Sequence, residues 1–163
     1  MSHKLMVVAH PNDESMFAGL RLATQPNQWK VVCVTNGNNW VRRKEFENAM
    51  KLCEAEYEIW SYPDSEHEQI NEWSLENDLR RVIYEKYWER ILTHNQNGEE
   101  GHFHHKQIHN VMRSIINNVG VFTFGEQMSD SLWFRKLVLI KQYNSQSQDC
   151  MNRVLMARSE LPD

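Results

Sequence analysis

The sequence predicts a three-layer α/β domain with a mostly parallel central sheet. Short, continuous apolar runs recur along the chain, first at residues 5–9 (LMVVA) and again at 30–35 (KVVCVT). Continuous runs of strand length are typical of strands that are covered on both faces. Segments with helical spacing of apolar residues lie between these runs, and this alternation of strand and helix favours parallel pairing.

The elements follow in order along the chain. After the strand at 5–9 we expect helices over 14–24, 42–57, 73–87 and 106–117, and strands over 30–35, 59–62, 90–93 and 119–124. Residues 95–101 predict a flexible loop, residues 132–140 fit either a strand or a helix, and residues 141–156 look partly helical. Because repeats and convincing linkers are absent from the sequence, we expect one domain over residues 1–163.

Composition restricts the classes of function. The net charge of −4 argues against broad nucleic-acid binding. Cys33, Cys53 and Cys150 are odd in number and scattered, which favours free, mostly buried thiols in a reducing compartment. No run approaches the roughly 20 apolar residues of a membrane span. We therefore expect a cytoplasmic protein without a membrane span, and a homo-oligomer is compatible with the sequence.

Two groups of polar residues mark a candidate site. His10, Asn12 and Asp13 follow the first strand directly, at the sheet edge where α/β folds bind ligands. Five of the eight histidines lie between His94 and His109, after the expected loop. Two histidines and a carboxylate with an open position are a donor set typical of catalytic zinc. His102 and His105 are spaced to share a helix face, whereas His104 and His105 are not expected both to face inward.

These residues carry a family resemblance. Residues 9–14 (AHPNDE) resemble the AHPDDE signature of the LmbE-like (PIG-L) zinc-dependent deacetylases, which act on N-acetylglucosamine conjugates. Residues 101–105 (GHFHH) resemble the second signature of that family, GHPDH. Weaker similarities follow in chain order, at residues 34–37, at Arg42, Glu45 and Ala49, at residues 62–64, and at Lys136 with residues 143–146.

The resemblance implies a fold, a reaction and residue roles. The fold would be the Rossmann-like LmbE-like deacetylase fold, and the reaction would be zinc-dependent hydrolysis of the N-acetyl group of a small amino-sugar conjugate. The implied roles are metal ligation by His10, Asp13 and His105, oxyanion stabilisation by His102, and substrate contacts by Arg42, Asp64 and Glu14, of which Glu14 also suits a supporting or capping role.

Two positions depart from the family pattern. Asn12 stands where the family has the aspartate that acts as general base, and an amide cannot take a proton near neutral pH. His104 stands where the GHPDH signature has an aspartate, and either a proton-carrying group or a spare histidine fits there.

Three accounts of Asn12 remain open. In the first account, Asn12 is a deliberate Asp→Asn substitution. In the second, it is a natural change in a protein that recruits another base, such as His104 or Glu14. In the third, the protein is a catalytically weakened sugar binder. We favour a working hydrolase because the expected metal ligands are all retained. The alternative is a metal-retaining sugar or nucleotide-sugar binding protein with little or no turnover, and a structural protein with adventitious metal affinity ranks third.

Overall fold

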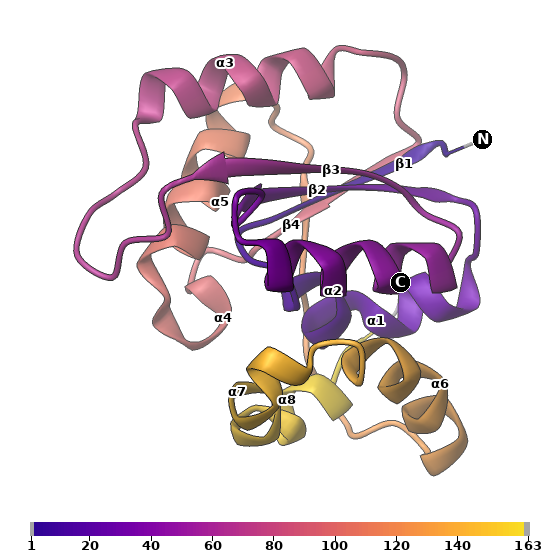
Figure 1. Ribbon diagram of the computed structural model, residues 1–163. Coiled ribbons are helices and arrows are strands. Elements are labelled where there is room, and N and C mark those ends of the chain that lie inside the picture. Colours follow the sequence, from indigo (N-terminus) through magenta and orange to yellow (C-terminus); the bar gives the residue numbers. More distant parts are fainter. Residues whose placement is uncertain (1, 162–163) are drawn as a thin grey trace.

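The computed structural model describes residues 2–161 and contains a five-stranded sheet with helices on both faces (Figure 1). The strands lie in the order β3-β2-β1-β4-β5, and every strand pairs with its neighbours in parallel. Their bounds are β1 Lys4–Val8, β2 Trp29–Thr35, β3 Glu56–Tyr62, β4 Arg90–Thr93 and β5 Gly120–Val121. This topology confirms the predicted Rossmann-like α/β class.

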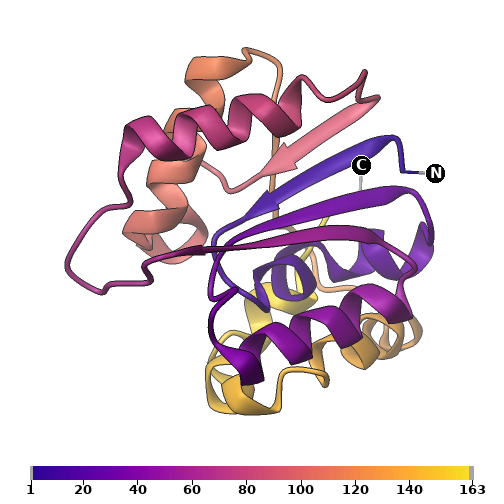
Figure 2. The same ribbon diagram turned by 45° about the horizontal axis from the view of Figure 1, so that its top comes forward.

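The helices form the outer layers. Their bounds are α1 Asp13–Thr24, α2 Trp40–Leu52, α3 Glu72–Ile83, α4 Gly98–Gly101, α5 Phe103–Ile115, α6 Asp130–Ile140, α7 Ser147–Asn152 and α8 Val154–Arg158, with a 3₁₀ turn, η1, over Asn144–Gln146. Helices α1 and α2 cover one face of the sheet, and α3 and α5 cover the other (Figures 1 and 2). Across residues 2–161, no helix combines the length and the apolar character needed to cross a lipid bilayer.

Strand β1 explains why its sequence is apolar at every position. Met6 and Val8 belong to the core beneath α1 and α2, whereas Leu5 and Val7 belong to the core beneath α3 and α5. Successive side chains of a strand point to opposite faces, so a strand with a helical layer on each side needs apolar residues throughout. The three cysteines are free and buried, as predicted.

The C-terminal third adds helices behind α1. Residues 132–140, ambiguous in sequence, are helical and belong to α6, which packs against α1. The Lys136 ammonium is fully buried there and donates to Met16 O at 2.7 Å, Ala157 O at 2.6 Å and Glu160 Oε2 at 2.7 Å. Glu160 in turn accepts the backbone N–H of Leu20 at 2.9 Å. These contacts bind the end of the chain to the first helix.

The predicted strand at 119–124 is much shorter in the structure. Only Gly120 and Val121 pair with β4, because the chain then leaves the sheet toward the C-terminal segment. Phe124 forms an isolated antiparallel bridge with Glu160 instead. Strand β1 is the central strand of the sheet and β4 lies beside it, and the chain leaves these two strands toward opposite faces, to α1 and α5 (Figure 1). This is the switch point at which open α/β sheets bind ligands.

Candidate active site

The turn after β1 is fixed by backbone hydrogen bonds. The N–H of Ala9 donates to His94 Nε2 at 2.9 Å, and the hydroxyl of Thr35 donates to Ala9 O at 2.8 Å. Asn12 then adopts a left-handed conformation with φ 115°, which asparagine tolerates better than most residues. The N–H of His10 donates to Asp13 Oδ2 at 2.8 Å. The turn thus presents His10 and Asp13 together at the sheet edge.

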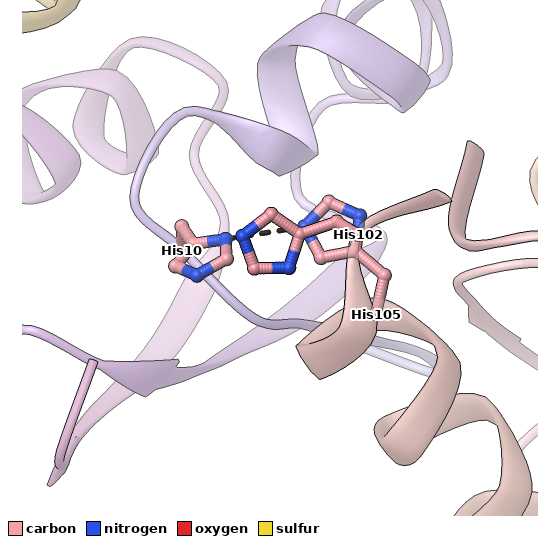
Figure 3. A group of neighbouring side chains, drawn as sticks. All are labelled: His10, His102 and His105. Carbon is pink, nitrogen blue, oxygen red and sulfur yellow. Dashed lines mark hydrogen bonds between the residues drawn. The ribbon is translucent and has the colours of Figure 1, made fainter. Parts of the chain in front are cut away.

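Three potential ligand atoms form a compact triangle. His10 Nδ1, Asp13 Oδ2 and His105 Nε2 lie 3.1 Å from one another along each edge. A tetrahedral zinc site with metal–ligand distances of about 2.0–2.1 Å separates its ligand atoms by about 3.3 Å, so the triangle fits such an ion. His10 lies in the turn after β1 and His105 near the start of α5, and a dashed line joins their rings in Figure 3.

The charges in this triangle favour a cation. Burial opposes ionisation of Asp13, but His105 and His10 hold the pKa of its carboxyl well below its usual range. Burial also opposes protonation of His105, yet Asp13 and Glu99 raise the pKa of the imidazole to about 9. Within residues 2–161, Asp13 Oδ1 is among the buried side-chain atoms that lack a hydrogen-bond partner. A buried carboxylate with a free oxygen suits a divalent ion.

Glu99 supports His105 from behind. Its Oε1 lies 2.9 Å from His105 Nδ1 and 2.6 Å from His94 Nδ1. A carboxylate on the outer nitrogen of a ligating histidine fixes the ring and the tautomer. The prediction of a flexible loop over residues 95–101 is therefore wrong for its second half. Residues 98–101 form the short helix α4, and the Glu99 carboxylate is buried. Sequence reasoning missed Glu99, since a single glutamate in a polar loop carries no pattern.

Other histidine and carboxylate groups overlap with this triangle. His10, His102 and His105 form one such group, His10, Asp64 and His104 a second, and Asp13, His94 and His105 a third. His94 is poorly suited to bind an ion, because its Nε2 accepts the Ala9 N–H and its Nδ1 faces Glu99. The His10, Asp13 and His105 set combines mutual distances of 3.1 Å with a carboxylate on the outer nitrogen of each histidine.

His102 lies at the mouth of the site. Its ring stacks on His105 with centroids 4.6 Å apart, and its Nδ1 accepts the N–H of His104 at 3.2 Å, capping α5 (Figure 3). Burial and the neighbouring His10 and His105 lower the pKa of His102 to about 4, so the ring is neutral near pH 7. Since Nδ1 accepts, Nε2 carries the proton and remains as a donor.

His104 faces inward beside His105, contrary to the expectation that only one of them would. Both residues are buried, because the site wraps around the first turn of α5 rather than meeting a single face. His104 Nε2 lies 2.9 Å from Glu68 O, and its Nδ1 lies 3.7 Å from Asp64 Oδ1. The ring therefore packs against the loop after β3, which carries Asp64 and Glu68.

Asp64 supports His10 as Glu99 supports His105. Its Oδ1 lies 3.1 Å from His10 Nε2, and its Oδ2 accepts from Asn36 Nδ2 at 3.1 Å. The hydrogen bond from His10 is the largest cause that holds the pKa of Asp64 well below its usual range. Arg42 Nη1 lies 3.5 Å from Asp64, and Arg42 Nη2 donates to Pro11 O at 2.9 Å. Both side chains line the cavity described below.

Glu14 is fully buried and turned away from that cavity. Its carboxylate accepts hydrogen bonds from the hydroxyls of Tyr143 and Ser15, and from the N–H of Asn12 at 3.2 Å. Burial raises the pKa of Glu14 to about 7. The substrate contact of Glu14 stays a prediction, and its burial and hydrogen bonds agree with the alternative supporting role.

Two small cavities open beside the histidines, each with a volume of about 310 Å³. The first is lined by His10, Asn12, Arg42, Asp64, Glu66, His102, Gln146, Asp149 and Arg153, and the second by Gly98, Glu100, Gly101, His102, His105, Asp149 and Arg153. A larger apolar cavity of about 510 Å³ lies among α6, α7 and α8 and shares no lining residue with these two. The chemistry-bearing residues therefore surround the smaller pair.

Sequence comparison identifies relatives. A family profile described as "PIG-L: GlcNAc-PI de-N-acetylase" matches residues 5–116. The chain is also 37% identical over 165 residues to an uncharacterized protein of Acanthamoeba polyphaga mimivirus, and the alignment covers 90% of this chain and 72% of that protein.

Solved structures share the fold at low sequence identity. N,N′-diacetylchitobiose deacetylase from Pyrococcus horikoshii is 16% identical with a TM-score of 0.72, over 89% of this chain and 71% of that one. The A40926 pseudoaglycone deacetylase Dbv21 is 15% identical with a TM-score of 0.69, over 96% and 88% of the two chains. The hydratase GalB from Pseudomonas putida KT2440 is 17% identical with a TM-score of 0.68, over 95% and 84%. Because a hydratase shares the fold, the fold alone does not fix the reaction.

The profile match covers most of the chain and includes both histidine signatures. The chain therefore belongs to the PIG-L (LmbE-like) family of deacetylase-type hydrolases.

Proposed function

We propose that the protein is a zinc-dependent N-deacetylase that hydrolyses the N-acetyl amide of a small N-acetylglucosamine-type conjugate. The observation that carries the proposal is the triangle of His10 Nδ1, Asp13 Oδ2 and His105 Nε2, with 3.1 Å edges, beside a polar cavity. Nitrogen and carboxylate donors in a buried site suit zinc, and other divalent ions compete for the same donors.

The roles of the remaining residues follow from their positions. A bound zinc ion would polarise the acetyl carbonyl and acidify the attacking water. His102 would donate its Nε2–H to the developing oxyanion, since its Nδ1 is engaged by the helix backbone. Arg42 lines the cavity and is suited to polar groups of the substrate. Asp64 would orient His10 and, with its partly exposed carboxylate, meet a sugar hydroxyl.

Acetate release tests the proposal. The purified protein is incubated with zinc and with N-acetylglucosamine or N,N′-diacetylchitobiose, and the zinc content per chain is measured alongside. The variants His10→Ala and His105→Ala are expected to lose both bound zinc and acetate release. His67→Ala serves as the matched control, because His67 lies outside both cavities. Unchanged zinc content in both site variants would refute the ligand assignment.

A second candidate rests on Asn12. An amide beside the cavity leaves residue 12 unable to act as a base, which favours a metal-retaining sugar or nucleotide-sugar binding protein with little turnover. Such a protein would bind N-acetylglucosamine conjugates in a zinc-dependent manner but release no acetate. Calorimetric titration with the same sugars, run beside the acetate assay, separates the two functions.

A further inference from the structure

The side chain of Asn12 is held by a carboxylate from the far end of the chain. Asn12 Nδ2 donates to Asp149 Oδ2 at 3.2 Å and lies 3.9 Å from Cys150 Sγ. Because an ionised carboxylate only accepts hydrogen bonds, the amide nitrogen must face Asp149. Asn12 is almost fully buried, so the contact is part of the wall of the site.

Asp149 reaches the cavities that surround the histidines. Its side chain is 40% exposed, and it lines the cavity next to His10 as well as the cavity next to His105. Arg153 holds the carboxylate from one side, with Nη2 2.5 Å from Oδ2 and Nε 3.2 Å from Oδ1. This ion pair restrains the orientation of the carboxylate.

The other candidates for a replacement base are poorly placed. Glu14 is fully buried, and its carboxylate is occupied by Tyr143, Ser15 and a backbone N–H. His104 is also fully buried, and its Nε2 is engaged by Glu68 O. Neither side chain lines either of the two cavities.

We propose that Asp149 supplies the carboxylate base that Asn12 cannot provide, and that Asn12 positions it. This inference rests on the proposed deacetylase function. An aspartate at residue 12 would face Asp149 where the amide now donates, and two carboxylates at that distance repel each other. The amide at residue 12 and the carboxylate at residue 149 are therefore complementary, and the pair carries one negative charge in total.

The reaction step balances with water as the only co-reactant. Asp149 takes one proton from the attacking water while the water oxygen bonds to the acetyl carbonyl carbon. The carbonyl π electrons move to the oxygen, which His102 stabilises by donating its N–H. The proton passes to the amide nitrogen as the C–N bond breaks, and the products are the free amine and acetic acid, which ionises to acetate.

Exchange of the two side chains tests the proposal. Acetate release from N,N′-diacetylchitobiose is measured for the wild type, Asp149→Asn, and the double variant Asn12→Asp with Asp149→Asn. Loss of general-base assistance lowers rates by about 10²–10⁴-fold, so we expect kcat of Asp149→Asn to fall at least about 100-fold with KM and zinc content nearly unchanged. The double variant is expected to recover most of that loss, because a carboxylate and an amide again face each other.

Asp130→Asn is the matched control. Asp130 is an exposed aspartate that pairs with Arg158 in the same C-terminal segment, and it lines neither cavity. Its kcat is expected to equal that of the wild type.

The other outcomes overturn the proposal in distinguishable ways. An active wild type with unchanged kcat in Asp149→Asn refutes the role of Asp149 alone. A loss that the exchange does not recover shows that Asp149 is merely structural. Activity confined to the exchanged variant shows that residue 12 itself must carry the base. An absence of acetate release from all variants refutes the deacetylase function as well.

Discussion

Lys136→Met should destabilise the protein strongly, because Lys136 connects three segments through one buried ammonium. The substitution removes hydrogen bonds to Met16 O, Ala157 O and Glu160 and keeps the volume of the side chain similar. Two carbonyl oxygens lose this donor, and each one left unsatisfied costs about 1–3 kcal/mol of stability. Glu160 also loses its closest cation. Glu160 keeps the N–H groups of Leu20 and Arg21 at 2.9 and 3.2 Å, which limits the damage.

We therefore expect the free energy of unfolding to fall by about 3–5 kcal/mol, the cost typical of breaking a buried ion pair. Urea unfolding followed by tryptophan fluorescence measures the change, with Lys141→Met as a control at an exposed lysine near the end of the same helix. A loss below about 1 kcal/mol would contradict the view that this ion pair holds the C-terminal helices on α1.

Two further predictions concern supporting carboxyls. Raising a carboxyl pKa from 4.5 to about 7 corresponds to about 3 kcal/mol, so Glu14 favours the folded state fully below pH 4.5 and loses that contribution as the pH rises through 7. In Glu14→Gln, the free energy of unfolding should depend less on pH between 4.5 and 7 than it does in the wild type. If urea unfolding gives the same pH dependence for both proteins, the prediction is contradicted. Asp64→Asn should weaken zinc affinity about 10–100-fold by releasing His10 Nε2, as measured by chelator competition, and an unchanged affinity would show that Asp64 does not orient the ring.

Much of the fold could be predicted because the sheet is covered on both sides. Residues 5–9 and 31–34 are apolar throughout, and the structure pairs residues 6–8 of β1 with residues 31–33 of β2. Prediction was weaker where tertiary contacts override local pattern. Residues 122–124 look like the end of a strand, yet Phe124 leaves the sheet to pair with Glu160, more than 30 residues later.

The candidate site also contains residues that the sequence predicted and residues that it did not. His10, Asp13 and His105 stand in two recognisable signatures, and the structure brings them within 3.1 Å of one another. Glu99 and Asp149 had no sequence signal, since each is a lone acidic residue in a polar segment. Glu99 contacts His94 through a local turn, and Asp149 contacts Asn12 across 137 residues of chain. Neither contact can be predicted from the periodicity of apolar residues.

The contact between Asn12 and Asp149 also has a consequence for synthesis of the protein. The metal-ligand candidates all lie before residue 106, whereas Asp149 follows more than 40 residues later, so the two parts of the site are synthesised at different times. Asp149 lies in α7, and its contact with Asn12 closes a loop of 137 residues. The entropic cost of closing such a loop grows only slowly with its length. A chain cut between residues 105 and 149 would therefore keep every proposed metal ligand and lose the proposed base, so that the requirement for metal and the requirement for the carboxylate fall on separate parts of the chain.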